Sequence, residues 1–299
     1  EMQRSLVGSE MCIRDSIVKE LSTIDSKPAR NTVAECYTEI ISDLKNSTEL
    51  LSGDFNKGKV NRWAAMTLLS RVYLYKGEYN EALTMAENAI KGAEKEGYAL
   101  WTNEEYPTAW GNDASASNPG EILFEIVNLT TDSPGKESMG YLNSYNGYDD
   151  MCITCSFYQL LKKDPKDVRL KILSFDKKYY AYVNKYQPQQ GENITDANIP
   201  LIRLSEAYLN AAEAAVQTGD NAKAVKYLNS IVQRANPENS VEGKTLTLEN
   251  VLDERRKELV AEGHRMYDVI RNGMTVKRID VKAVSYTHLR AHETTLHLV

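Results

Sequence analysis

Apolar residues near the start of the chain recur every three or four positions, as they do on the buried face of an amphipathic helix. The segment from Asn31 to Leu51 follows this pattern at Val33, Cys36, Tyr37, Ile40, Ile41, Leu44 and Leu51. The run Phe55-Asn-Lys-Gly-Lys59 interrupts it, and a segment dense in Ala, Leu and Tyr follows from Val60 to Tyr75. The pattern predicts two helices.

A glycine and a set of small residues predict that the second helix turns back into a third. Gly77 ends the second helix, and the segment from Tyr79 to Ala93 carries its small residues on one face, which lets two helices approach closely. A later segment repeats the arrangement, with a helix over 202–218, a turn at 219–220 and a helix over 222–234. The positions Gly77, Ala82 and Ala89 have the same offsets as Gly219, Ala224 and Ile231, which matches tetratricopeptide hairpins.

The two hairpins are too far apart in sequence for a continuous repeat array, so we expect one helical scaffold, about 31–96 and 199–279, with an insertion over about 97–198. The insertion begins with a loop-like stretch rich in Asn, Ser, Gly and Pro. It is expected to contain a strand over 121–126, a helix over 156–162, a further helix from Asp164 and a strand over 177–186. Long irregular segments on a rigid scaffold usually carry function.

The most strongly charged part of the chain is the segment 254–273, which we call the charged segment. Gly263 in its middle predicts the end of one helix, with His264 to Arg271 forming a second short helix. Residues three and four positions apart on a helix face each other, so the expected pairs are Arg255 with Glu258, Glu258 with Glu262, and Asp268 with Arg271.

The amino-acid composition and the net charge argue against some classes of function. The 299 residues are 42% hydrophobic, which is enough for a substantial core, and the fold class indicated is mainly α. A net charge of -6 and a pI of about 5.5 argue against a nucleic-acid-binding protein, which would usually present a basic face. No apolar run reaches the roughly 20 residues of a membrane span. Tyrosine is abundant, with 18 residues against 4 Phe, and supplies flat rings with polar tips.

Both ends of the chain look foreign to it. The segments 1–16 and 284–299 resemble translated sequencing-adapter fragments and lack a period that fits their neighbours. We therefore expect a single native domain over about 17–283, truncated at both ends. The motif His292-Glu293 with His297 lies in this tail, and its second histidine is one residue too far along for a zinc-protease helix.

The remaining candidates for metal or redox chemistry are weak. Cys152 and Cys155 form a CxxC pair, but no second pair or nearby His completes a zinc site, and a thioredoxin-like setting is absent. The alternatives are two ordinary thiols, a local disulfide, or a redox or metal role. The expectation is no catalytic residue, no metal and no cofactor.

Several stretches, in order, resemble the SusD/RagB family of outer-membrane nutrient-binding lipoproteins. The segment Gly58–Tyr75 resembles the family's first repeat helix, and Glu121–Ile126 its central strand. The segments 199–214 and 228–235 resemble the next hairpin, and 251–273 resembles the family block ERR…E…EG.R..D..R. The resemblance covers nearly all of 17–279.

The resemblance implies tetratricopeptide-like hairpins packed against a variable, loop-rich half. It implies an outward-facing position on the outer membrane, held there by an N-terminal lipid anchor that we expect to be missing from this truncated sequence. It also implies that the protein binds an oligosaccharide or, in some branches, a peptide, and that its partner is a TonB-dependent, SusC-like transporter. No nucleic acid is expected as a ligand.

The charged residues that match the family block are expected to have a structural role. A hydrolase would need two carboxylates facing each other across a cleft, and nothing in the sequence indicates that cleft. The preferred interpretation is a set of buried or half-buried salt bridges that join the repeats to the charged segment. Its members are Arg203, Glu206, Glu213, Glu254, Arg255, Glu258, Glu262, Arg265, Asp268 and Arg271.

Aromatic residues of the insertion are the candidate ligand-binding groups. Sugar rings present flat C–H faces that stack on aromatic rings, while amide side chains bind their hydroxyls. The candidates are Trp101, Trp110, Tyr141, Tyr145, Tyr148, Asn143 and Asn146. The alternative is that the two tryptophans pack over the scaffold core. The sequence thus favours a glycan-binding protein of an uptake system; the other classes weighed are a tetratricopeptide interaction scaffold and, less favoured, a glycoside hydrolase.

Overall fold

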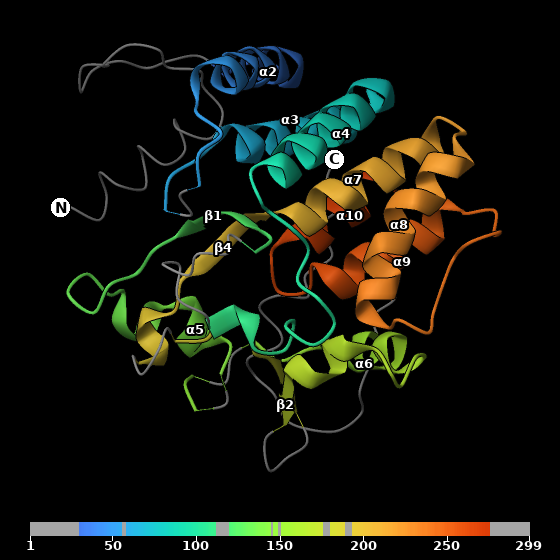
Figure 1. Cartoon of the computed structure of the whole chain (residues 1–299). Coiled ribbons are helices and arrows are strands. Elements are labelled where there is room, and N and C mark those ends of the chain that lie inside the picture. Colours follow the sequence, from blue (N-terminus) through green and yellow to red (C-terminus); the bar gives the residue numbers. More distant parts are fainter. Residues whose placement is uncertain are drawn as a thin grey trace, which may run out of the picture.

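The computed structural model of the protein describes residues 30–55, 58–111, 120–144, 146–148, 151–175, 180–188 and 193–275. This part of the chain is mainly helical with four short strands, which confirms the predicted fold class. In Figure 1 the long helices lie across the upper and right parts of the molecule, while α5, α6 and β2 of the insertion lie along the lower edge. The terminal segments predicted to be foreign lie outside the described residues.

The first three helices form as predicted. They are α2 (Val33–Leu50), α3 (Arg62–Lys76) and α4 (Tyr79–Lys95). The Thr32 hydroxyl accepts a hydrogen bond from the Glu35 amide, and the Glu35 carboxylate accepts one from the Thr32 amide at 2.8 Å, so a capping box starts α2. Gly77 has φ 83°, the left-handed conformation that favours glycine where a helix ends and the chain reverses.

The second predicted hairpin is also present, as α7 (Leu204–Gln217) and α8 (Asn221–Ala235). Gly219, at φ 79°, makes the turn, and the Asp220 carboxylate caps α8 by accepting from the Lys223 amide at 3.0 Å. The predicted start of α7 at Ile202 is wrong by two residues, because 199–203 pairs as a strand before the helix begins.

The two hairpins are neighbours in space although they are distant in sequence. Helix α4 packs against α7, so α3, α4, α7 and α8 follow one another across the scaffold (Figure 1). Alanines without accessible surface occur on both helices, at Ala82, Ala86 and Ala89 in α4 and at Ala207, Ala211 and Ala214 in α7. Small side chains leave room for this close approach. One hydrophobic core joins the four helices with Val251 and Leu259.

The charged segment forms two helices, α9 (Leu248–Glu258) and α10 (His264–Arg271). The prediction that Gly263 ends the first helix is wrong, since α9 ends at Glu258 and a turn occupies 259–263. Gly263, with φ 79°, instead immediately precedes α10. Ala261 in the same turn also has a positive φ of 65°, which is uncommon for a residue with a Cβ.

The insertion is held at its base by two antiparallel strands. Strand β1 (Ile122–Ile126) leaves the scaffold side and pairs with β4 (Ile199–Arg203), which leads directly into α7. Between them lie short elements. These are η2 (Gly135–Glu137), α5 (Met139–Leu142), α6 (Cys155–Lys162), η3 (Val168–Ile172), β2 (Leu173–Phe175), β3 (Ala181–Val183) and η4 (Ile194–Asp196).

Two details of the insertion differ from the sequence predictions. The helix expected from Asp164 is the 3-10 helix η3, which starts at Val168, and the expected strand over 177–186 is β3 alone within the described residues. The insertion also has a small core of its own, to which Trp101, Tyr106 and Trp110 contribute around η1 (Ala109–Gly111). No helix of the described part is long and apolar enough to cross a membrane.

Candidate functional site

The structure buries two of the predicted ligand-binding aromatics. Trp101 is 8% exposed and Trp110 is 6% exposed. Their ring centroids are 5.0 Å apart in an edge-to-face arrangement, and Tyr106 packs edge-on against both. The Lys185 ammonium and the Arg203 guanidinium lie 4.8 and 4.9 Å from the Trp110 ring centroid. Neither indole presents an open stacking face. Both pack in the small core of the insertion, and not over the scaffold core as the alternative had it.

The loop after α5 brings two other predicted aromatics together. The rings of Tyr141 and Tyr148 meet edge to face with centroids 5.0 Å apart, and the Tyr148 amide donates to the Tyr141 carbonyl at 3.2 Å. Tyr148 is 46% exposed and Tyr141 is half-buried. Gly147 makes this geometry possible, because a Cβ there would lie 1.9 Å from the Tyr141 carbonyl oxygen. Tyr145 lies outside the described residues.

The two predicted asparagines differ in what their side chains do. Asn143 is buried, and its amide donates to the Met139 carbonyl at 2.9 Å, so it completes the end of α5. Asn146 is exposed beside Tyr148, and its backbone amide donates to the Ser144 hydroxyl at 3.2 Å. The accessible part of the predicted set is therefore Tyr141, Tyr148 and Asn146, with the Lys136 ammonium 6.0 Å from the Tyr141 ring centroid.

The charged residues form a buried network centred on Arg203 at the end of β4. Its guanidinium binds Glu262 through two hydrogen bonds of 2.8 Å each and Glu258 at 3.2 Å, and it also binds Glu121. The side chains of Arg203, Glu121 and Glu258 have no exposed surface. Burial removes the hydration of every charged group in the network. Each buried charge is therefore tolerated only while it keeps its oppositely charged partners.

Three cations absent from the predicted set complete this network. Arg234 in α8 binds Glu258 at 2.6 Å and Glu121 at 3.2 Å. Arg169 in η3 binds Asp167 and Glu254 at 2.6 Å each. The Lys185 ammonium binds the Glu262 carboxylate at 2.5 Å and the Glu258 carbonyl at 2.6 Å. Arg169 and Lys185 belong to the insertion, so the network joins the insertion to the charged segment.

A second cluster joins α7 to α10. Arg271 binds both oxygens of Glu213, one of them at 2.7 Å, and the Asp268 carboxylate at 2.6 Å. Arg255 donates to the Asn210 amide oxygen at 2.8 Å and contacts Asp268 at 3.3 Å. In α3, Arg71 binds Glu206 through two bonds of 2.5 and 2.6 Å.

The outcome for the predicted pairs within the charged segment is mixed. The Asp268–Arg271 pair is confirmed. Arg255 pairs with Asp268 and Glu213 rather than with Glu258. The Glu258–Glu262 pairing is wrong, since two carboxylates repel, and both instead bind Arg203. Arg265 makes no ion pair within the part of the chain that the structure describes, whereas the other nine residues of the set each do.

Two buried carboxylates in the network have opposite pKa shifts. Burial raises the pKa of Glu121, although Arg234 and Arg203 oppose the change. Burial would also raise the pKa of Glu258, but Arg234, Arg203 and Arg169 outweigh it and lower the pKa well below the usual range. Opposite shifts can mark an acid and base pair in hydrolases. Here both side chains are fully enclosed, so no sugar reaches them.

One feature of the sequence predicts part of this buried network. Glu121 adjoins the apolar strand β1, and a carboxylate next to a buried strand requires a cation to offset its lost hydration. Arg169, Arg234 and Lys185 carry no comparable local signal. Apart from Asp167, which lies two positions from Arg169, their carboxylate partners are between 24 and 113 positions away.

The described residues contain no group of three His, Cys, Asp or Glu side chains that could hold a metal ion. Cys155 begins α6 with a free, exposed thiol, so the CxxC pair is not closed by a disulfide. The buried carboxylates are matched instead by arginine and lysine.

Sequence models of two families match the chain. One, described as the SusD family, matches residues 174–293. The other, described as starch-binding and associating with the outer membrane, matches residues 15–74. Together they cover the first repeat helix and the region from β2 through the charged segment.

Known relatives resemble the chain over most of its length. A SusD-like protein of Bacteroides ovatus is 24% identical over 297 residues, covering 85% of this chain and 54% of that protein. A solved structure from Bacteroides vulgatus, named as a candidate sugar-binding protein, is 99% identical, with a TM-score of 0.88 over 90% of this chain and 60% of that one. A SusD superfamily structure from Bacteroides thetaiotaomicron is 36% identical, with a TM-score of 0.82 over 93% and 63%. The chain thus spans between 54% and 63% of the length of these relatives.

Proposed function

Because this chain belongs to the SusD family, we propose that it is a non-enzymatic glycan-binding protein of the outer cell surface. In the complete protein it hands oligosaccharides to a TonB-dependent, SusC-like transporter in the outer membrane. Relatives named for binding sugar or starch support the ligand class, and the family described as associating with the outer membrane supports the location.

The observation that carries the proposal is the exposed tyrosine pair after α5. Tyr148 presents 46% of its surface, and its edge-to-face contact with Tyr141 holds the ring in place before a ligand arrives. A rigid aromatic face loses little conformational entropy on binding, which is what a stacking platform for a sugar ring requires. Asn146, on the same loop, supplies a polar side chain for sugar hydroxyls.

The ion pairs argue for binding rather than hydrolysis. A glycosidase needs two carboxylates about 5–10 Å apart in a cleft that the sugar can enter. The clustered carboxylates of the described residues lie in the interior, where arginine and lysine neutralise them. Incubation of the purified protein with starch, laminarin and other soluble glycans should release no reducing sugar; release above the level of a heat-denatured sample would contradict this part of the proposal.

The binding claim is tested by affinity gel electrophoresis in gels that contain each of these polysaccharides. We expect the native chain to be retarded by at least one of them, and Tyr148→Ala to be retarded less. Tyr267→Ala is a matched control, because Tyr267 is an exposed tyrosine of α10, outside the insertion. Equal loss of retardation in both variants would exclude a specific role for Tyr148.

The transporter claim requires the full-length protein in its own membrane. Affinity purification of a tagged full-length protein from detergent-solubilised outer membranes should co-purify a TonB-dependent transporter. Recovery of the protein alone, under conditions in which a known pair of the family stays together, would contradict this claim and leave the glycan-binding claim unaffected.

A further inference from the structure

Helix α10 is amphipathic, but its charged residues face the interior of the molecule. His264, Asp268 and Arg271 are spaced three and four positions apart, so they lie on one face of the helix. His264 and Asp268 are buried, and the Arg271 side chain is nearly so where it binds Asp268 and Glu213. The polar side of α10 therefore packs against the scaffold.

The opposite side of α10 is apolar and exposed. Met266, Tyr267 and Ile270 keep 55%, 56% and 50% of their surface, and Met274, just beyond the helix, keeps 36%. We call these four residues the outer patch. The Tyr267 ring stacks on Tyr75 of α3, with centroids 5.9 Å and planes 23° apart, so the patch adjoins the scaffold surface. Neighbouring exposed apolar side chains of this kind mark a contact surface.

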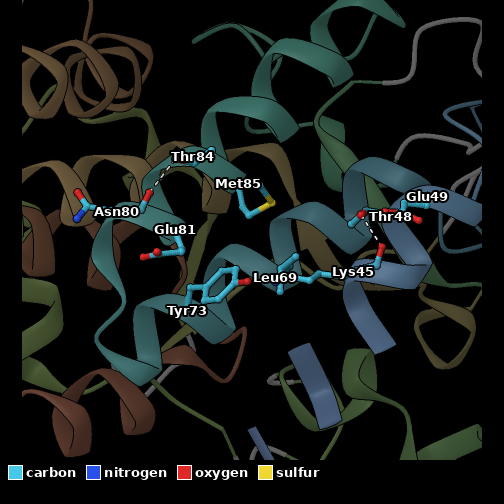
Figure 2. Close-up of a pocket in the computed structure, with 9 residues that line it drawn as sticks. All are labelled: Lys45, Thr48, Glu49, Leu69, Tyr73, Asn80, Glu81, Thr84 and Met85. Atoms are coloured by element: carbon cyan, nitrogen blue, oxygen red, sulfur yellow. Dashed lines mark hydrogen bonds between the residues drawn. The ribbon is translucent and has the colours of Figure 1, made fainter. Parts of the chain in front are cut away.

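The depression between α2 and α4 shows the ordinary arrangement for a surface that faces water. Helix α4 turns its alanines inward, and the two walls of the depression carry mainly hydrophilic side chains (Figure 2). These side chains are Lys45, Thr48, Glu49, Asn80, Glu81 and Thr84. Helix α10 has the reverse arrangement, which is typical of a helix with a second packing partner on its outer side.

We propose that, in the full-length protein, the polypeptide that follows α10 folds back and packs over the outer patch. The solved Bacteroides vulgatus structure is 99% identical, and this chain spans only 60% of it, so that protein contains further polypeptide. Helix α10 ends at Arg271 and the described residues end at Thr275, so the chain continues from a point beside the patch. A covalently attached segment meets such a surface at high effective concentration.

The small size of the outer patch favours a segment of the same polypeptide over a separate protein. A stable interface between two proteins uses roughly 20–30 residues from each partner. The outer patch offers four side chains on and just after a helix of eight residues. Packing within one polypeptide needs no such area, because association costs no translational freedom. This inference does not depend on glycan binding.

The first test measures whether the outer patch is covered in the full-length protein. Purified monomer is treated with hydrogen peroxide, and the oxidation rate of each methionine is followed by peptide mass spectrometry. Methionine oxidation follows exposure, and Met151 of the insertion, 46% exposed, is an internal reference. In the 299-residue chain, Met266 should react at least as fast as Met151. In the full-length monomer the order should reverse, with Met266 the slower of the two.

The second test identifies the segment that covers the patch. The photo-crosslinking amino acid p-benzoylphenylalanine replaces Tyr267 in the full-length protein, and mass spectrometry identifies the peptide that it captures on irradiation. We expect a cross-link within one molecule to polypeptide that follows α10. The same amino acid in place of Tyr148, an exposed tyrosine of the insertion, should not capture that peptide.

A substitution checks that the contact stabilises the fold. Ile270→Ser should lower the melting temperature of the full-length protein by several degrees, but leave that of the 299-residue chain unchanged, because half of the Ile270 surface already faces water there. The matched control is Leu129→Ser, which replaces a similarly exposed apolar residue of the insertion and should leave both melting temperatures unchanged.

Three outcomes would overturn the inference. In the first, Met266 of the full-length monomer still reacts as fast as Met151, which would leave the patch open to a separate protein. In the second, Tyr267 is cross-linked to polypeptide that precedes α2. In the third, it is cross-linked to a second copy of the protein, which would make the patch a dimer contact.

Discussion

Arg203 binds Glu262 through two parallel hydrogen bonds, from Nε to Oε2 and from Nη2 to Oε1, each 2.8 Å long. The arginine is the last residue of β4, and the glutamate lies in the turn between α9 and α10. The planar guanidinium matches the carboxylate at two points, which fixes direction as well as distance. The end of β4, where the chain passes from the insertion back to the scaffold, is thereby held against the charged segment.

Replacing Arg203 should destabilise the fold severely. Arg203→Met keeps much of the side-chain volume but leaves Glu121, Glu258 and Glu262 with one buried cation fewer. Removing one partner of a buried ion pair typically costs about 3–5 kcal/mol. The free energy of unfolding, from urea titration followed by circular dichroism, should fall by about this amount.

Lys76→Ala serves as the control for Arg203→Met. Lys76 pairs with Glu78 at 2.6 Å, but both side chains are more than a third exposed, so water screens their attraction. The expected loss is below about 1 kcal/mol. Equal losses in the two variants would show that the Arg203 network contributes no more than a surface pair.

Acid should weaken the fold partly through Glu206. Burial alone would raise the pKa of this carboxyl, but Arg71, His264 and Arg255 outweigh burial and lower it from 4.5 to about 2. The folded-state pKa lies below the unfolded one, so the stabilisation is complete above about pH 5 and is lost as the pH falls toward 2. The shift corresponds to about 3 kcal/mol. Between pH 6 and pH 2, the native chain should lose about that much more stability than Glu206→Gln.

Glu238→Gln is the matched control for the acid experiment. Glu238 also pairs with a cation, Lys166, but their side chains are 70% and 62% exposed. This variant should lose as much stability on acidification as the native chain does. If Glu206→Gln follows the same curve, then Glu206 is not the carboxyl that confers the acid sensitivity.

Because Trp110 is buried, replacing it should reduce the stability of the fold, whereas the sequence alone predicts that replacing it reduces ligand binding. Trp110→Ala removes a ring that packs against Trp101 and Tyr106 and lies beside the cations of Lys185 and Arg203. Large-to-small substitutions of this kind cost about 3–5 kcal/mol. The melting temperature should fall markedly, while the fraction that remains folded should bind glycans with unchanged affinity. A loss of glycan affinity at an unchanged melting temperature would instead support a role for Trp110 in ligand binding.

Gly147 should be needed for the tyrosine pair rather than for the fold. In Gly147→Ala the new methyl group would collide with the Tyr141 carbonyl oxygen, so the loop must move and the contact between Tyr141 and Tyr148 must open. We expect glycan affinity to fall at least as far as in Tyr148→Ala, with a loss of stability below about 2 kcal/mol. Ser144→Ala, on the same loop without such a collision, should retain most of the affinity.

The hairpins of the scaffold could be predicted from sequence because their determinants are local. Gly77 and Gly219 supply the left-handed turns, and alanines at fixed offsets mark the helix faces that meet. The charged residues could likewise be assigned a structural role from their density. Their partners could not be predicted, because helical spacing reveals contacts three or four positions apart, whereas Arg203 reaches Glu121 across 82 positions.

For the predicted ligand-binding residues, the sequence alone could not predict which side chains are accessible. Polar neighbours made Trp101 and Trp110 look accessible, but tertiary packing decided their burial by bringing η3, β3 and the charged segment around them. The same polar neighbours predict that Tyr141 and Tyr148 are accessible, and in the structure Tyr148 is exposed while Tyr141 is half-buried. Composition alone does not separate these two cases.

The pairing of β1 with β4 at the base of the insertion determines which other segments could replace the insertion. Because β1 and β4 pair antiparallel, and the Leu204 amide donates to the Glu121 carbonyl at 2.7 Å, the two ends of segment 127–198 leave the scaffold side by side. Doubling the length of a flexible loop between fixed ends costs only about 0.6 kcal/mol of folding free energy. Replacing this segment with one of different length or specificity should therefore change the stability little. The charged segment nevertheless imposes a condition. A replacement segment must supply cations in place of Arg169 and Lys185, because otherwise the buried carboxylates of Glu254 and Glu262 lose a cationic partner.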